Sequence, residues 1–386
     1  MRQRNPESVK FAYHPPMTKS ETAGTTGPTV RTPANRLGLD YVAEAARLGV
    51  PAGGIIDVHT HINGTDAARI YRRVADLYGI RRTYSMTALE QVEAVRGVLG
   101  DRIRFIAVPN YMGRDRRYHH GRGFIERIRK FHALGARIVK FWAAPRGLDY
   151  GRESGDADLL RLDAPLRLAA MEVAADLGMI FMTHVADPDT WFAAKYSDSG
   201  IYGTKAQQYE PLEAMLQRFD RPWIAAHMGG WPEDLEFLTG LLNRHDNLYL
   251  DCSAAKWMVR ELGRHRRDEL VSFLRTFRGR ILFGSDILTS DEHLTPGEDG
   301  EMEAKAGSPE EAFDLYASRY WALRTMLETD YHGPSPIADP DLAMIDPERY
   351  GEMDAPTLDG KSLPQDVLDS VYHQAATDLL DRLYDT

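Results

Sequence analysis

The chain has 386 residues, a length that could hold two average domains or one large barrel with extensions. Its composition, 43% hydrophobic and 27% charged, is ordinary for a soluble enzyme. The formal net charge of −10 argues against a general nucleic-acid binder, and no apolar run reaches the roughly 20 residues that a membrane span needs. The only cysteine, Cys252, excludes an intrachain disulfide, as expected of a cytoplasmic protein.

Residues 1–53 are expected to form an amino-terminal arm and a lead-in segment. Up to about residue 36 this segment is rich in Ser, Thr, Pro and Gly and shows no hydrophobic periodicity, so it cannot bury enough surface to fold alone. No apolar stretch follows the early basic residues, which argues against a secretory signal. The arm either lies on a neighbouring subunit, as in a homo-oligomer, or forms a disordered tail.

Residues 54–330 are expected to form one domain, in which short apolar runs alternate with amphipathic segments. This alternation is typical of βα units around a parallel sheet, and eight such units favour a closed (β/α)8 TIM barrel. Strands are predicted at 55–59, 83–86, 104–108, 138–142, 179–184, 223–227, 248–252 and 281–285, and helices at 64–78, 88–98, 123–134, 165–176, 211–218, 232–242 and 266–277.

The barrel is followed by a carboxyl-terminal extension, residues 331–386. Before it, residues 289–308 are acidic and rich in Gly and Pro, and they form either a lid over the barrel mouth or a solvated insertion. A helix is predicted at 310–328. The final helix, 364–383, has apolar residues at helical spacing and is expected to pack on the outside of the barrel.

Four predicted strands end in side chains that can bind a metal. His59 and His61 share one face of the first strand, because residues i and i+2 of a strand point the same way. His184, His227 and Asp286 follow three later apolar runs. The carboxyl ends of barrel strands meet at one mouth, so these groups predict a site for a divalent zinc, manganese or iron ion.

The motifs around these residues resemble the amidohydrolase superfamily, specifically the amidohydrolase-2 group related to aminocarboxymuconate semialdehyde decarboxylase. The matching motifs are Asp57-Val58-His59-Thr60-His61, Ala226-His227-Met228-Gly229-Gly230 and Phe283-Gly284-Ser285-Asp286-Ile287. The resemblance implies that His59, His61, His184 and Asp286 hold one metal, zinc in the first place, with a bound water. It also implies that His227 acts beside this water as an acid, a base or an electrostatic partner, or that it binds a second metal.

The fourth strand departs from the family, because Trp142 replaces the histidine of the usual Val-Lys-Leu-His-Pro segment. The resemblance leaves Lys140 as a cation facing the substrate, as the partner of a buried carboxylate, or as a carbamate bridging two metals. Arg146 offers a fork for a substrate carboxylate or lies on the surface. Together Lys140, Trp142 and Arg146 predict a small, planar, anionic substrate. A separate basic cluster is expected to be a solvated loop: Arg114, Arg116, Arg117, His119, His120 and Arg122.

The expected function is therefore that of a metal-dependent hydrolase. A divalent metal lowers the pKa of bound water, and Asp286 can take the proton of this water and return it to a leaving group. A non-oxidative decarboxylase, with Asp286 or His227 handling the proton, is the alternative. A non-catalytic barrel used for binding is disfavoured, because every candidate ligand is present.

Overall fold

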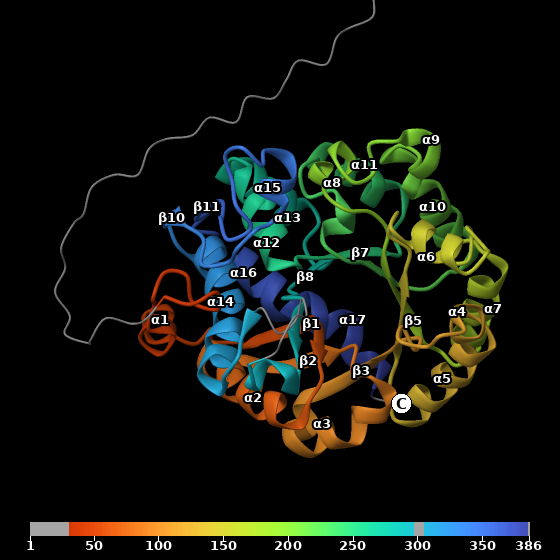
Figure 1. The fold of residues 1–386 in the computed structure, drawn as a ribbon, viewed down its shortest axis with the longest axis horizontal. Coiled ribbons are helices and arrows are strands. Elements are labelled where there is room, and N and C mark those ends of the chain that lie inside the picture. Colours follow the sequence, from red (N-terminus) through yellow and green to blue (C-terminus); the bar gives the residue numbers. More distant parts are fainter. Residues whose placement is uncertain (1–30, 297–304, 385–386) are drawn as a thin grey trace, which may run out of the picture.

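A sheet of nine parallel strands forms the centre of the computed structural model, which describes residues 31–296 and 305–384 (Figure 1). The arm at residues 1–30 and the middle of the expected lid, residues 297–304, lie outside these ranges. From β1 to β8 the neighbours in the sheet follow chain order, and β9 pairs with β1. The strands are β1 Ile55–Ile62, β2 Ile80–Ser85, β3 Ile103–Ala107, β4 Ile138–Trp142, β5 Ile180–His184, β6 Trp223–Ala225, β7 Leu248–Asp251, β8 Ile281–Leu282 and β9 Ile287–Thr289.

The sheet closes into the predicted (β/α)8 barrel where the segment from β8 to β9 meets β1. In this segment β8 pairs with β7, and β9 pairs with β1. Between them, the Val58 N–H donates to the Phe283 carbonyl (2.9 Å), and the Asp286 N–H donates to the His59 carbonyl (2.8 Å). The barrel is thus confirmed. The prediction of one continuous strand at 281–285 is wrong, because the backbone turns away before β9 and gives Asp286 a φ of 58°.

Helices surround this barrel (Figure 1). The Pro165–Asp176 helix has the predicted bounds, since proline occupies its first position and Gly178 follows its end. No helix in the described ranges is long and apolar enough to cross a lipid bilayer. The helices up to residue 328 are α1 Tyr41–Leu48, α2 Thr65–Tyr78, α3 Val92–Leu99, α4 Arg116–His120, α5 Arg122–Ala133, α6 Gly147–Glu153, α7 Pro165–Asp176, α8 Asp189–Ala193, α9 Ser199–Tyr202, α10 Tyr209–Arg218, α11 Leu235–Arg244, α12 Ala255–Arg260, α13 Arg267–Thr276 and α14 Pro309–Glu328.

Helix α1 lies in the segment that the sequence had marked as an arm and lead-in. The Asp40 side chain accepts hydrogen bonds from the backbone N–H groups of Val42 and Ala43, which caps the helix. Tyr41 and Ala45 are buried, and α1 packs against α14. An N-cap aspartate followed by apolar residues four apart was the available signal for this helix.

The carboxyl-terminal extension contacts both ends of the barrel. A hairpin of β10 (His332–Pro334) and β11 (Thr357–Asp359) encloses α15 (Asp341–Ile345). After it, α16 (Gln365–Asp369), a π-helical turn and α17 (Ala375–Leu380) form the last helical stretch, which lies near the centre of the view in Figure 1.

This last helical stretch packs on the barrel at the starts of the strands. The N–H of Gly279, two residues before β8, donates to the Ser370 hydroxyl at 3.2 Å. Arg82, near the start of β2, forms an ion pair with Asp381. The floor of the barrel is therefore closed, and the opposite end carries the polar strand termini.

Candidate metal centre

The imidazoles of His59 and His61 face the carboxylate of Asp286 at the barrel mouth. The Oδ1 atom of Asp286 lies 3.3 Å from Nε2 of His59 and 3.2 Å from Nε2 of His61. One ligand atom from each residue lies within 4.8 Å of the other two. Two imidazole nitrogens and a carboxylate oxygen are donors that zinc, manganese and iron accept. The residues thus fit the metal that the motifs predicted.

A carboxylate from β7 orients His59. The Oδ2 atom of Asp251 accepts a hydrogen bond from Nδ1 of His59 at 2.9 Å, and its Oδ1 accepts from the backbone N–H of His227 at the same distance. A carboxylate on one ring nitrogen fixes the tautomer and leaves the other nitrogen for a metal. Sequence reasoning missed Asp251, although the apolar run at 248–250 ends in this carboxylate as other runs end in histidine.

The charge states of the centre favour metal binding. Burial opposes the ionisation of Asp286, but hydrogen bonds from His59 and His61 hold the pKa of this carboxyl well below its ordinary value. Burial lowers the pKa of His61. Burial and the neighbouring His184 hold the pKa of His227 well below the ordinary value. A neutral His61 and an ionised Asp286 are the forms that bind a metal. Burial opposes protonation of His59, but the carboxylates of Asp251 and Asp286 outweigh burial and raise the pKa of this ring, so a metal would displace a proton from it.

His227 follows β6 in a left-handed conformation, with a φ of 58°. Its Nδ1 lies 2.8 Å from the Ser253 hydroxyl, and its ring centroid lies 4.9 Å from that of His59. His59, His227 and Asp251 form a second group of close ligand atoms, which keeps a two-metal centre geometrically open. The loop after His227 requires glycine at position 230, because a β-carbon at this position would lie 2.1 Å from the Ala186 carbonyl oxygen.

His184 ends β5 and lies in the same cavity, outside the group formed by His59, His61 and Asp286. Its Nε2 lies 2.8 Å from the carboxylate of Asp187, and its ring centroid lies 4.6 Å from that of His227. To serve as the fourth ligand through Nε2, His184 would have to leave Asp187. Its role as a ligand stays a prediction.

A cavity of about 770 Å³ opens in front of these residues. Lys140, at the centre of β4, is buried on its wall, and its Nζ has no hydrogen-bond partner among the described residues. Burial lowers the pKa of this ammonium to about 8. The Trp142 ring also lines the cavity and meets Tyr150 edge-on, with centroids 5.5 Å apart. The cavity thus offers an aromatic wall and an unpaired cation.

Arg146 is exposed and lies outside the lining of this cavity, with its guanidinium 5.6 Å from the centre of the Tyr150 ring. Arg114, Arg116 and His120 line the cavity in its place. The expectation of a solvated loop is wrong for Arg116 and His120, which belong to a helix, whereas Arg114 lies in an exposed loop at the edge of the cavity.

The reason is the helix α4. The Asp115 side chain caps it by accepting from the Tyr118 N–H at 2.9 Å, and the helix then presents Arg116 and His120 to the mouth. Burial lowers the pKa of His120 to about 3, so this imidazole is neutral near pH 7. Arg116 is not free, because Glu153 lies 2.7 Å from its guanidinium.

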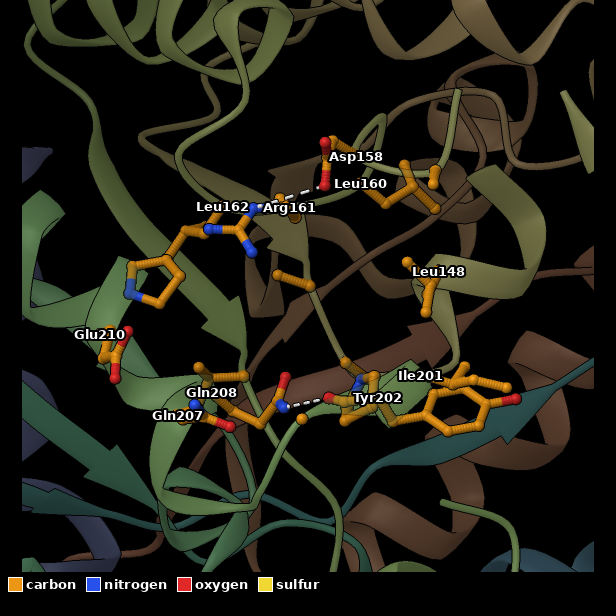
Figure 2. Close-up of a pocket in the computed structure, with 18 residues that line it drawn as sticks. Leu148, Asp158, Leu160, Arg161, Leu162, Ile201, Tyr202, Gln207, Gln208 and Glu210 are labelled. Carbon is orange, nitrogen blue, oxygen red and sulfur yellow. Dashed lines mark hydrogen bonds and ion pairs between the residues drawn. The ribbon is translucent and has the colours of Figure 1, made fainter. Parts of the chain in front are cut away.

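A second cavity, of about 290 Å³, lies between the loops that follow β4 and β5 (Figure 2). Leu160 lines both cavities. The second cavity is lined by Leu148, Ile201 and Tyr202 together with the side chain of Arg161, which lies 3.7 Å from Asp158. The metal-binding group belongs to the larger cavity.

Comparison with known proteins gives one family. The sequence model of the family described as Amidohydrolase matches residues 56–382. No curated protein matches the chain significantly.

The chain also matches solved structures, with low sequence identity and TM-scores below 0.5 for the three that follow. A probable 2-pyrone-4,6-dicarboxylic acid hydrolase from Acinetobacter baumannii is 11% identical over 84% of this chain and 98% of its own, with a TM-score of 0.43. The 5-carboxyvanillate decarboxylase of Novosphingobium aromaticivorans, solved with manganese, is 11% identical over 71% and 91%, with a TM-score of 0.38. The 2,6-dihydroxybenzoate decarboxylase of Rhizobium is 14% identical over 76% and 95%, with a TM-score of 0.32.

Proposed function

Since the chain belongs to the amidohydrolase family, whose model matches residues 56–382, we propose that it is a metal-dependent hydrolase of a small, planar, anionic organic molecule. One observation carries this proposal. The His59, His61 and Asp286 group opens into a cavity lined by the Trp142 ring and by Lys140, whose Nζ has no hydrogen-bond partner within residues 31–296 and 305–384. An anionic, aromatic ligand would pair its charge with Lys140 and pack its ring against Trp142.

His59, His61 and Asp286 would hold the metal, with His184 as the fourth ligand and zinc as the proposed ion; manganese or iron would suit the same donors. When bound, such an ion lowers the pKa of a water molecule and polarises a carbonyl group.

Side chains of the protein would carry out proton transfer and substrate binding. The ionised carboxylate of Asp286 accepts a proton from the attacking water and returns it to the leaving group. The neutral imidazole of His227, held by the Ser253 hydroxyl, assists as a proton donor or acceptor. The ammonium of Lys140 binds the carboxylate of the substrate.

The test incubates metal-loaded protein with aromatic amides, lactones and carboxylic acids in oxygen-18 water, with products read by mass spectrometry. Label in an acid product is the expected result. A product lighter by carbon dioxide and free of label overturns the proposal in favour of a decarboxylase. The Asp286→Asn protein is the control: it keeps the shape of the side chain but loses the proton carrier and the charge of one metal ligand, so it should show no turnover.

A further inference from the structure

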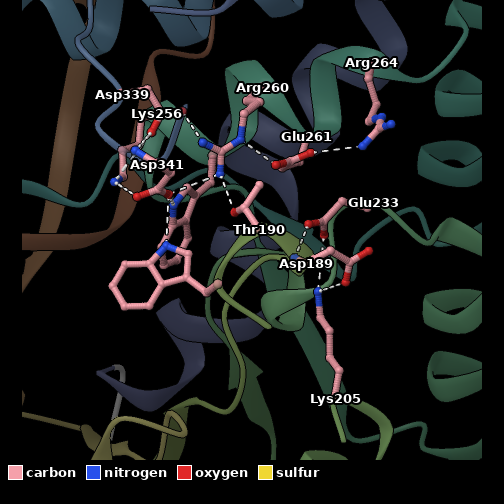
Figure 3. Close-up of polar contacts among 12 residues, drawn as sticks. Asp189, Thr190, Lys205, Glu233, Lys256, Arg260, Glu261, Arg264, Asp339 and Asp341 are labelled. Atoms are coloured by element: carbon pink, nitrogen blue, oxygen red, sulfur yellow. Dashed lines mark hydrogen bonds and ion pairs between the residues drawn. The ribbon is translucent and has the colours of Figure 1, made fainter. Parts of the chain in front are cut away.

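The carboxyl-terminal extension reaches the metal cavity through one buried carboxylate, Asp341, at the start of α15. Its Oδ2 accepts hydrogen bonds from the indole N–H groups of Trp191 and Trp257, each at 2.9 Å. Arg260 donates to the same oxygen at 3.1 Å, and Lys256 donates to Oδ1 at 3.1 Å (Figure 3). One side chain of the extension therefore holds four donors from α8 and α12.

Trp257 connects Asp341 to the metal centre. Its ring lines the cavity and stands perpendicular to the His227 ring, with centroids 5.4 Å apart and an interplanar angle of 90°. It also lies 6.1 Å from the His184 ring. An indole has a single N–H donor, and Trp257 uses it on Asp341. The orientation of the ring beside both histidines thus depends on this carboxylate.

Asp339 provides an internal comparison, because it lies two residues earlier and shares the cations of Asp341. It forms ion pairs with Arg260 and, at 3.7 Å, with Lys256 (Figure 3). Both aspartates are buried, so both need these cations to stay ionised. The two indole hydrogen bonds go to Asp341. A role in charge balance is common to the two residues, whereas a role through the indoles is specific to Asp341.

We propose that Asp341 is a positioning residue for the active site, which fixes the indole of Trp257 beside His227 and so lets the carboxyl-terminal extension shape the wall of the substrate cavity. The inference rests on the proposed function, because it assumes that the substrate binds in this cavity. It connects the carboxyl-terminal extension, which follows the barrel in sequence, to the wall of this cavity through one side chain.

The first measurement compares indole ¹H–¹⁵N resonances in metal-loaded wild type, Asp341→Asn and Asp339→Asn. Tryptophan-to-phenylalanine variants assign the Trp191 and Trp257 signals. The asparagine at 341 keeps the size of the side chain but loses its charge and one acceptor oxygen. We expect both signals to move in Asp341→Asn and to stay in place in Asp339→Asn. An unmoved Trp257 signal in Asp341→Asn overturns the proposal.

The second measurement titrates benzoate, as an aromatic anion, into the same proteins by calorimetry. Asp341→Asn and Trp257→Phe should each weaken benzoate binding by about tenfold, because misplacing a wall group disturbs bound geometry. In the Trp257→Phe protein, adding Asp341→Asn should have no further effect, since the carboxylate acts through the indole. Asp339→Asn keeps an oxygen that can accept the Asp341 backbone N–H (3.2 Å) and touches neither indole, so benzoate affinity should stay within about twofold of wild type.

Additive effects of the two substitutions, or equal losses in Asp339→Asn and Asp341→Asn, would reduce Asp341 to a structural role. Should Asp341→Asn fail to fold, unchanged benzoate affinity in Trp257→Phe overturns the proposal. If wild type binds no benzoate, the indole signals decide. None of these readouts needs turnover, so a failed search for hydrolysis leaves them intact.

Discussion

The buried ammonium of Lys140 should lower the stability of the fold. Its pKa is lowered by burial from 10.5 to about 8, so the unfolded chain binds the proton more tightly than the folded protein does. The resulting penalty is complete below pH 8 and disappears as the pH rises past 10.5. We expect Lys140→Met to raise the free energy of unfolding by about 3 kcal/mol at pH 7, and by progressively less above pH 8.

Urea denaturation of wild type and Lys140→Met at pH 7, 9 and 10 measures this gain. Benzoate titration should show the opposite sign, because Lys140→Met removes the cation that binds the anion. A stability difference that is the same at every pH would contradict the assignment of the penalty to Lys140. Lys140→Gln, which removes the charge but keeps a polar group, separates charge from polarity.

We expect Asp251 to control metal affinity through the hydrogen bond that its Oδ2 accepts from His59. Asp251→Asn keeps the shape of the side chain but weakens the hydrogen bond that orients His59. Loss of such a partner typically costs 10–100-fold in metal affinity. Competition with a chelator, followed by elemental analysis, measures the change. Asp246→Asn, an exposed site after α11, is the control and should retain wild-type metal content.

At the scale of the elements, the apolar runs predicted where strands begin better than where they end. β4 has the predicted bounds, whereas β6 ends at Ala225, two residues before the predicted end at His227. The cause is backbone conformation, since His227 and Asp286 both adopt positive φ beyond their strands. An apolar run in the sequence does not predict this change of backbone direction. The change places a functional side chain in the mouth of the barrel and costs some local strain.

The helical stretch from Gln365 to Leu380 should be essential for stability, because it closes the floor of the barrel. Leu380 is fully buried, whereas Asp378 is exposed. We expect Leu380→Ala to lower the free energy of unfolding by about 2–5 kcal/mol, and Asp378→Ala to change it by less than about 0.5 kcal/mol. Guanidinium denaturation measures both. Equal effects would mean that the stretch is only loosely attached.

For the whole molecule, the sequence was informative about groups that share a short segment and poor about groups that meet through the fold. His59 and His61 lie two residues apart, and their spacing alone placed them on one face of a strand. Arg114 and Trp257 enter the cavity only because loops from distant parts of the chain converge there. No local pattern records such convergence, so these residues could not be predicted.

Association of subunits is our proposal for the 386-residue chain. Residues 1–36 lack the periodicity needed to fold alone, and an arm of this kind can gain contacts on a second subunit. Sedimentation of the full chain and of a chain beginning at residue 31 tests this. We expect a homo-oligomer for the full chain and weaker association after truncation. A monomer at high protein concentration would contradict the proposal.

Metal binding should stabilise the whole barrel, because its ligands come from the two segments that close it. His59 and His61 belong to β1, and Asp286 lies between β8 and β9. A metal that binds the folded chain alone adds about 2.7 kcal/mol at a free concentration 100 times its dissociation constant. The thermal midpoint of chelator-stripped protein should therefore rise as manganese or zinc is added. His61→Ala removes one ligand and should flatten this rise. If the midpoint of wild type is independent of both metals, the closing segments do not share an ion and the ligand assignment is wrong.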